Sequence, residues 1–383
     1  MKHSYIAKRF QSSAAGLSLD TEALAKYKDI IDLSIGDTDF TTDESIINAA
    51  FRDAKAGHTH YGDPKGDPEL IDAVCRAWEE DFGQRLPRDH VLVSASSCLG
   101  MALVMLAILD PGDEVIVFSP YFPMYREQIE LAGGVCVDVP TYASEDYAID
   151  EARLHAAITP RTKAIVFNNP TNPTGMGYDG KTLELLARVA QEHDLLIAAD
   201  EIYTTYLYEG DFRPIRTLPG MAERTITLNS FSKNFLMTGW RVGVIIAEPE
   251  LLAVMNRVNG SLIYSAPSIS QRAAIQALAM RKEIREKYVT AYRDRIFYAA
   301  DRIEKIPYLS LVRPKGTFYL FPGVEKTGLD EKAFCKVLLD QAHVLVSPGT
   351  PFGVSAAGHF RIACTVGIDQ LKTAFDRMEK LSF

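Results

Sequence analysis

The chain has 383 residues, of which 47% are hydrophobic and 24% charged, a composition typical of a globular protein and not of a fibrous or disordered one. Its 41 basic and 50 acidic residues give a net charge of −9, which argues against nucleic acid or an anionic membrane as partner and favours a small molecule. The five cysteines are odd in number and lack CxxC spacing, so we expect no disulfide framework, no metal site and a reducing, cytoplasmic location.

An alternating pattern of strands and helices occupies most of the chain after a helix-poor start of about 45 residues. Short apolar, β-branched runs predict strands over residues 91–95, 114–118, 135–139, 163–168, 195–199, 225–229 and 240–247. Helices are predicted between them, for example over residues 98–109, 123–132 and 181–193, each entered or left through Gly, Pro, Asp or Asn. This alternation is typical of a large α/β domain with a parallel sheet covered on both faces.

The pattern changes after about residue 267. A long charged helical region extends to residue 305, followed by short strands near 309–322 and 344–348 and a closing helix near 369–381. A chain of this length is also longer than one compact core usually holds, so a second, smaller domain is expected beside the large one. We therefore predict a large domain over residues 46–275 and a small domain built from residues 1–45 and 276–383.

Polar residues follow three neighbouring predicted strands at the point where each strand ends. NNPTNPTG follows residues 163–167, DEIY follows 195–199, and SFSK follows 225–228. Ligands of open α/β sheets bind at the carboxyl ends of the strands. The segments therefore predict that Asn172, Asp200, Tyr203 and Lys233 converge on one crevice.

A phosphate site is predicted next to that crevice. Ser97 and Cys98 begin a helix directly after a strand, where unpaired backbone N–H groups and the helix dipole attract an anion. Ser230, Ser232 and Arg241 flank the lysine and add hydroxyls and a guanidinium. An aromatic, phosphorylated aldehyde fits this set of groups.

At these residues the chain resembles the class I/II aminotransferases, enzymes of fold-type I that depend on pyridoxal 5′-phosphate (PLP). The resemblance extends from LSIGDTDF at 33–40 to HFRIACTVG at 359–367, and it is specific because the segments occur in the family's order and spacing. Between these ends stand YGDPKGDPEL, DPGDEVIVFSPYFPMY, NNPTNPTG, AADEIY, SFSKNFLMTGWRVG, PKGTFYLFP and VSPGTPFG. The resemblance implies an α/β fold with a mostly parallel seven-stranded sheet sandwiched by helices, plus a smaller α+β domain.

The resemblance also implies roles for the crevice residues. Lys233 would carry PLP as a Schiff base and, once freed, move a proton between the substrate and the cofactor. Asp200 would keep the pyridine nitrogen protonated, so that the ring can accept electrons. Tyr203 and Asn172 would hydrogen-bond the ring hydroxyl, and Phe122 would stack on the ring.

Substrate binding is implied at three further positions. Arg361 would take the substrate α-carboxylate as a bidentate pair, with Gly36 and Asn172 beside it. Tyr61 would reach the cofactor phosphate of a neighbouring subunit, which implies a homodimer with shared active sites. Cys98 stands where aspartate-using bacterial relatives place a lysine, so a strict preference for aspartate is not expected.

Each of these residues has a plainer structural interpretation as well. Asn172 suits a Pro-bracketed turn, and a single arginine in a late strand, such as Arg361, is often an ordinary ion-pair partner. Phe122 stands at helical spacing from Tyr125, which is equally compatible with two core aromatics. Ser97 and its neighbour are also compatible with a simple helix start. The combination of motifs, and no single residue, favours the functional interpretation.

The leading hypothesis is transfer of the amino group of an L-amino acid to a 2-oxo acid by a ping-pong mechanism. A PLP-dependent carbon–sulfur β-lyase of the cystathionine β-lyase type is the alternative, because a fold does not fix the reaction. A PLP-sensing regulator is not expected, since only about 30 residues precede LSIGDTDF, too few for a DNA-binding module. A nicotinamide dehydrogenase is disfavoured because no strand leads into GxGxxG.

Overall fold

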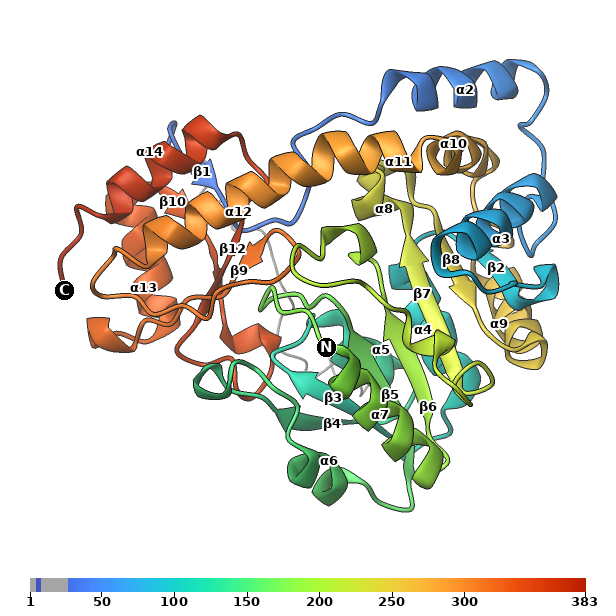
Figure 1. The fold of residues 1–383 in the computed structure, drawn as a ribbon, viewed down its shortest axis with the longest axis horizontal. Helices are drawn as coiled ribbons and strands as arrows, with labels where there is room; N and C mark the ends of the chain where they lie inside the picture. Colours follow the sequence, from blue (N-terminus) through green and yellow to red (C-terminus); the bar gives the residue numbers. More distant parts are fainter. Residues whose placement is uncertain (1–4, 8–26) are drawn as a thin grey trace.

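A seven-stranded sheet forms the centre of the larger part of the molecule (Figure 1). The computed structural model describes residues 5–7 and 27–383. The strands lie in the order β2-β8-β7-β6-β5-β3-β4, and all neighbours pair in parallel except β8, which runs antiparallel to β2 and β7. The predicted mostly parallel sheet is therefore confirmed. Its strands are β2 (Val91–Ser94), β3 (Glu114–Ser119), β4 (Val135–Pro140), β5 (Thr162–Asn168), β6 (Leu196–Asp200), β7 (Thr225–Ser230) and β8 (Gly243–Ile246).

Helices cover both faces of this sheet, which explains why its strands are almost continuously apolar. Along β5, Ala164 and Val166 belong to one buried cluster, whereas Ile165 and Phe167 belong to another, as expected when successive side chains point to opposite faces. The first cluster includes residues of α4 (Ser97–Ile108), α5 (Met124–Leu131) and α9 (Pro249–Leu262), and the second includes residues of α6 (Glu151–Ala157) and α7 (Gly180–Glu192).

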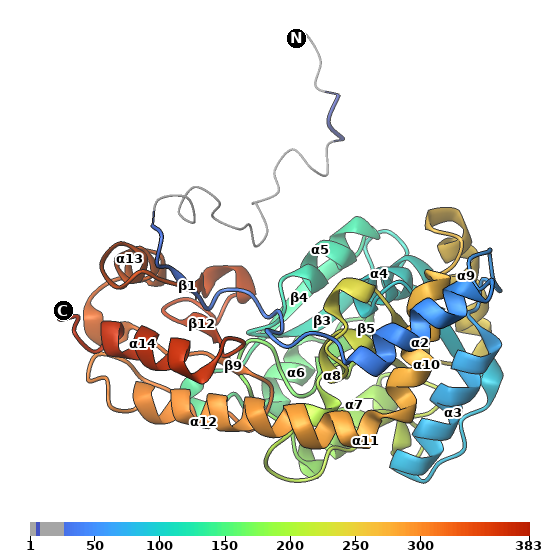
Figure 2. The same ribbon diagram turned by 90° about the horizontal axis from the view of Figure 1, so that it is seen from above.

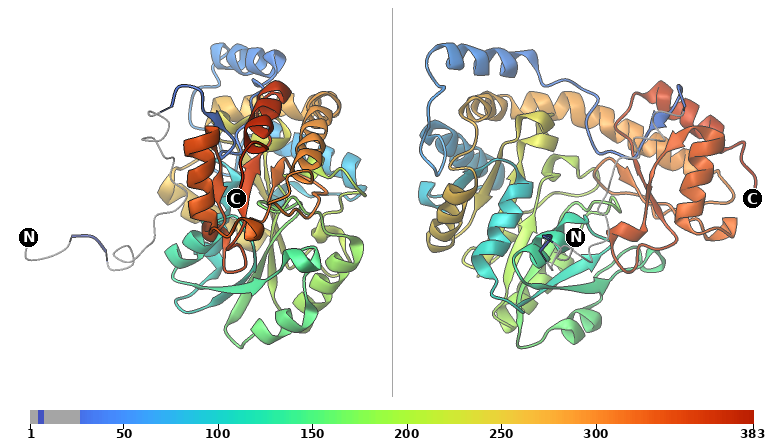
Figure 3. Two further views of the ribbon diagram at one scale, coloured as in Figure 1. Left: turned by 90° about the vertical axis from the view of Figure 1, so that its left-hand side faces the viewer. Right: turned by 180° about the vertical axis from the view of Figure 1, so that it is seen from behind.

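A smaller body contains two short sheets. In one, β12 (Phe360–Ala363) pairs antiparallel with both β11 (Ser347–Pro348) and β9 (Tyr319–Leu320). In the other, β1 (Ile31–Asp32) pairs in parallel with β10 (Val344–Leu345), so that a blue strand lies within the orange and red C-terminal part (Figure 3). Helix α13 (Glu331–Val337), the π-helical turn η9 (Leu338–Ala342) and α14 (Ile368–Met378) pack on a separate core.

The division into two domains at residues 45/46 and 275/276 stays a prediction. Residues 1–4 and 8–26 of the predicted small domain lie outside the described residues.

A long helical stretch connects the two bodies (Figure 2). It consists of α11 (Arg281–Ile284), the π-helical turn η7 (Arg285–Val289) and α12 (Thr290–Ile303), and it follows α10 (Ser268–Ala279) after a break at Met280. Helices α2 (Glu44–Lys55) and α3 (Pro68–Phe82) pack on α10. Within residues 5–7 and 27–383, none of the helices combines the length and apolar composition that a membrane crossing requires.

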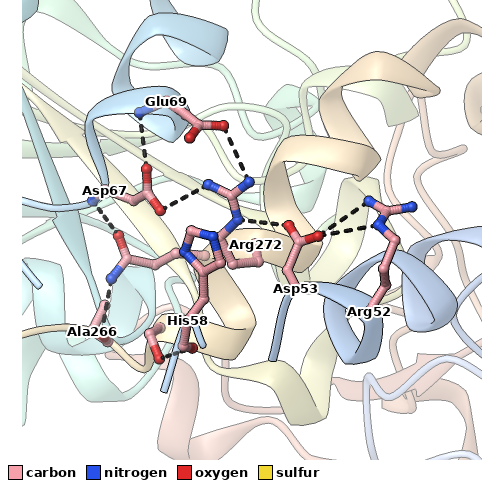
Figure 4. A network of polar contacts seen from close by, with 9 residues as sticks. Arg52, Asp53, His58, Asp67, Glu69, Ala266 and Arg272 are labelled. Atoms are coloured by element: carbon pink, nitrogen blue, oxygen red, sulfur yellow. Dashed lines mark hydrogen bonds and ion pairs between the residues drawn. The ribbon is translucent and has the colours of Figure 1, made fainter. Parts of the chain in front are cut away.

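Arg272 of α10 is the centre of an ion-pair network that ties α2 and α3 together (Figure 4). Its guanidinium donates to Asp53 at 2.7 Å, to Asp67 at 3.1 Å and to Glu69 at 3.1 Å. The Arg272 side chain is only 11% exposed, and Asp53 and Asp67 are 14% and 19% exposed, so the bonds to these two carboxylates are better shielded from water than surface pairs. The network ties the start of α3 to α10 and to α2.

Two predicted strands differ from the structure. The strand predicted from residue 240 begins at Gly243, because residues 238–240 form a 3₁₀ turn and Arg241 has a left-handed φ of 54°, which ends extended pairing. Between residues 309 and 322 a strand forms only over Tyr319–Leu320, with isolated bridges from Ser310 to Gly323 and from Gly316 to Leu207. Alternating apolar residues alone do not reveal where such short pairings stop.

Candidate active site

A cavity of about 720 Å³ lies at the carboxyl ends of β5, β6 and β7, where the large sheet meets the smaller body. Every site residue predicted from the sequence lines it except Tyr61. The lining residues among them are Gly36, Ser97, Cys98, Phe122, Asn172, Asp200, Tyr203, Ser230, Ser232, Lys233, Arg241 and Arg361. The structure therefore brings together segments that lie as far apart as positions 36 and 361, while the roles of the residues stay predictions.

Asp200 ends β6 and is buried at the floor of the cavity. The Tyr125 hydroxyl donates to its Oδ2, but its Oδ1 is buried and has no hydrogen-bond partner among the described residues. Burial raises the pKa of Asp200 to about 6, although the bond from Tyr125 counteracts this shift. A buried carboxylate oxygen without a donor is unfavourable by itself, so this position suits a ligand that brings an N–H or a positive charge.

Lys233 lies in the short helix α8 (Phe231–Asn234), which directly follows β7. Ser230 caps that helix by accepting a bond from Ser232 N at 3.1 Å, and the Tyr206 hydroxyl donates to the Lys233 carbonyl at 2.9 Å. The Lys233 Nζ donates to the carbonyl of Gly36 and forms no ion pair within the described part of the chain. The backbone of this lysine is thus held firmly, and its amine faces the cavity without an acidic partner.

Arg361 of β12 is fully buried in the wall of the cavity. Its Nη1 donates to Asn172 Oδ1 at 3.0 Å and its Nη2 to the Ser34 carbonyl at 2.6 Å, whereas its Nε has no partner among the described residues. The guanidinium lies between the rings of Tyr319 and Phe352, with its Cζ 4.7 Å and 5.0 Å from their centroids.

No carboxylate of residues 5–7 or 27–383 forms an ion pair with Arg361, and burial lowers its pKa. The plainer interpretation of this arginine as an ordinary ion-pair partner therefore lacks a counter-ion. Because a buried charge without an opposite charge is strongly unfavourable, the position suits an anionic ligand group. A planar guanidinium can bind a carboxylate through two parallel hydrogen bonds.

The start of α4 forms the opposite end of the cavity. Ser97 and Cys98 occupy its first turn, and the preceding Ser96 accepts a bond from Leu99 N at 3.2 Å, which leaves earlier amides of that turn without intrahelical partners. A Cβ on Gly243 of β8 would lie 2.8 Å from Ser97 N, so only glycine lets the strand approach this turn so closely. Arg241 also lines this end, as predicted for an anion site.

Several cavity residues were missed in the sequence, among them Tyr125, Asn168 and Tyr319. Tyr125 bonds Asp200, and Asn168 donates from its Nδ2 to the Asp200 carbonyl at 2.9 Å and accepts from Asn172 N at 2.8 Å. The Tyr319 hydroxyl lies 3.1 Å from that of Tyr203. Their positions within SPYFPMY, FNNP and TFYLF were the only available signals, since the partners lie far away in the chain.

Tyr61 lies outside the cavity. Its side chain is 88% exposed and meets Tyr264 edge to face, with ring centroids 5.1 Å apart. The role predicted for it requires a second subunit, so it stays a prediction.

Comparison with known proteins identifies relatives over nearly the full chain. Residues 28–378 match the family aminotransferase class I and II. The arginine–pyruvate transaminase of Pseudomonas aeruginosa is 35% identical over 99% of this chain and 97% of its own, and the aspartate/prephenate aminotransferase of Thermus thermophilus is 38% identical over 92% and 91%. Among solved structures, a Thermus thermophilus aspartate aminotransferase with maleate superposes with a TM-score of 0.92 at 35% identity and covers 99% of this chain and 100% of its own.

Proposed function

The chain belongs to the aminotransferase class I and II family of PLP-dependent transaminases, and from this premise we propose that the 720 Å³ cavity is the site of transamination between an L-amino acid and a 2-oxo acid. The observation that carries the proposal is the burial, in one cavity, of Arg361 without an acidic partner and of Asp200 without a donor to Oδ1. A substrate carboxylate and a protonated ring nitrogen are the groups that these two positions lack.

The residues present fit PLP. The orphaned Oδ1 of Asp200 suits a pyridinium N–H, and the first turn of α4 with Arg241 suits a phosphate. When bound, PLP supplies an aldehyde that binds amines covalently and a ring that withdraws electrons from the substrate α-carbon. We assign the ring hydroxyl to Tyr203 and Asn172, the ring face to Phe122, and the phosphate to the hydroxyl and amide groups of Ser97, Cys98, Ser230 and Ser232.

The chain's own side chains then have distinct tasks. Lys233 would hold the cofactor through its aldehyde, and its free Nζ would carry a proton to and from the substrate α-carbon. Asp200 would hold the ring nitrogen, whose positive charge when protonated would offset the burial that raises the pKa of Asp200 in the cofactor-free protein. Arg361 orients the substrate through its α-carboxylate, with the backbone of Gly36 close by.

The reaction type that the relatives support is amino-group transfer and not β-elimination. The relatives described above are named transaminases or aminotransferases, which gives no support to the lyase alternative. Their names include arginine, pyruvate, aspartate and prephenate, so we propose no single amino donor.

The test is an assay of the purified enzyme with PLP, single L-amino acids and 2-oxo acids. We expect a new amino acid to form only when both substrates are present, and Lys233→Ala to abolish it while the protein stays folded. Steady release of ammonia and pyruvate from cystathionine, with no 2-oxo acid added, would favour the lyase instead.

We also propose a homodimer with shared active sites, located in the cytoplasm. The exposed pair of Tyr61 and Tyr264 adjoins two further exposed apolar side chains, Leu262 and Ile263, a grouping typical of an interface. All five cysteines are free, which is consistent with a reducing compartment. Sedimentation of the holoenzyme and cell fractionation test these two points, and a monomer or a secreted enzyme would contradict them.

A further inference from the structure

Tyr319 joins the two halves of the site, although its role was not predicted. It lies in β9 of the smaller sheet, opposite Ala363 on the strand that carries Arg361. Its ring lies against the Arg361 guanidinium, 4.7 Å from Cζ, and its hydroxyl lies 3.1 Å from the hydroxyl of Tyr203, which belongs to the larger body. The side chain is buried, so water does not compete for either contact.

The hydroxyl of Tyr319, and not only its ring, is fitted closely into this place. A Cβ built on Gly36 would lie 1.7 Å from that hydroxyl oxygen and 2.6 Å from the adjacent ring carbon. The carbonyl of the same glycine accepts the bond from Lys233 Nζ. Tyr319 therefore occupies the space that the missing side chain of Gly36 leaves free.

Either phenol can donate in the bond between Tyr319 and Tyr203. Each phenol has one proton to donate, and the buried hydroxyl of Tyr203 has no other hydrogen-bond partner among the described residues. Burial, and then the neighbouring Tyr319, hold the pKa of Tyr203 well above its usual value, so Tyr203 keeps its proton. If Tyr319 donates to the Tyr203 hydroxyl, Tyr203 can donate its own proton to a group in the cavity. The first bond polarises the Tyr203 hydroxyl and so strengthens the second bond.

We propose that Tyr319 is a positioning residue that donates to the Tyr203 hydroxyl and thereby aims the Tyr203 proton at the oxygen on the cofactor ring. The inference rests on the proposed function, in which Tyr203 binds that oxygen. The ring of Tyr319 also packs against Arg361. One side chain therefore contacts both the residue assigned to the substrate carboxylate and the residue assigned to the cofactor. The hydroxyl serves the cofactor and the ring serves the arginine, so the two contributions are separable.

The variant Tyr319→Phe removes the hydroxyl and keeps the ring. The readout is the pH midpoint of the absorbance change of the bound cofactor in the holoenzyme without substrate. A bond donated to a ring oxygen stabilises its negative charge and lowers this midpoint, so a weaker bond should raise it. We expect Tyr319→Phe to raise the midpoint by up to about 0.7 of a pH unit, the equivalent of one ordinary hydrogen bond. The KM for the amino acid should change by less than about twofold, since the ring contact with Arg361 is retained.

Three further variants complete the experiment. Tyr203→Phe should raise the midpoint more than Tyr319→Phe, and the double variant should match Tyr203→Phe alone, because Tyr319 acts through Tyr203. Tyr208→Phe is the matched control. It also removes one phenol hydroxyl, bonded at 2.7 Å to the carbonyl of Thr317 just before β9, and it should leave the midpoint unchanged.

The variants distinguish a failure of the role proposed for Tyr319 from a failure of the assignment of Tyr203 to the cofactor. An unchanged midpoint in Tyr319→Phe, or additive shifts in the double variant, would overturn the role of Tyr319 and leave the proposed function standing. An unchanged midpoint in Tyr203→Phe as well would overturn the assignment of Tyr203 to the cofactor and the inference with it.

Discussion

Replacing Arg361 by lysine separates the charge of this side chain from its geometry. The guanidinium has five N–H donors, and two of them already serve Asn172 Oδ1 and the Ser34 carbonyl. Three donors therefore remain for a substrate carboxylate, enough for a bidentate pair. A lysine amine has three donors, and if it serves the same two oxygens, one donor is left. Arg361→Lys should thus lose about one charge-assisted hydrogen bond, which is worth about 1.5–3 kcal/mol.

That loss corresponds to a fall of roughly 10- to 150-fold in kcat/KM for an α-amino acid. The measurement is the rate at which an amino acid converts the bound cofactor to its amine form, followed by absorbance over a range of substrate concentrations. Arg313→Lys is the control, because Arg313 is a surface residue paired with Asp301 and Glu304. A value for Arg361→Lys within about twofold of the wild type would refute the assignment of Arg361 to the carboxylate.

Three other variants test the electrostatics and packing around the site. In the cofactor-free protein, burial raises the pKa of Asp200 from 3.8 to about 6. Relative to high pH, the protonated Asp200 therefore stabilises the fold fully below pH 3.8, and this stabilisation is lost as the pH rises through 6. Urea unfolding should therefore show Asp200→Asn gaining about 3 kcal/mol relative to wild type between pH 3.5 and pH 7, and a pH-independent difference would contradict this. Arg272→Met removes the common partner of Asp53, Asp67 and Glu69, leaves Asp67 without an ion pair among the described residues, and should lower the free energy of unfolding by about 3 kcal/mol. Arg52→Met, at a side chain that is 72% exposed, should change it by less than about 0.5 kcal/mol, and equal effects would contradict the network of Figure 4. Gly243→Ala places a Cβ 2.8 Å from the first amide of α4 and should cost about 1–3 kcal/mol of stability and weaken PLP binding, while Gly180→Ala points into open space and should do neither.

The large sheet could be predicted because each of its strands has a recognisable pattern in its own short stretch of sequence. Strands buried on both faces have continuous apolar runs, and the polar segment after each run marks its carboxyl end. That is how Asp200 and Lys233 were placed in one crevice, where the structure has them. The antiparallel β8 was less clear, because the left-handed backbone of Arg241 that delays its start has no signature in an arginine.

The contacts that complete the site could not be predicted in the same way. Tyr125 bonds Asp200 across 75 positions, and Tyr319 meets Tyr203 across 116 positions. The first pair depends on how α5 packs on the large sheet, and the second on how the smaller body sits against that sheet. Hydrophobic periodicity carries no information about either placement. From the sequence, Tyr125 was therefore considered only as a possible core aromatic beside Phe122.

The most direct test of the account is the location of the cofactor bond. The purified protein is mixed with PLP, reduced with borohydride and digested, and the modified peptide is identified by mass spectrometry. We expect a single phosphopyridoxyl group on Lys233, and none at that position after an excess of amino donor has converted the cofactor before reduction. A protein that stays unmodified, or that carries the group on another lysine, would contradict the assignment of this cavity as the active site.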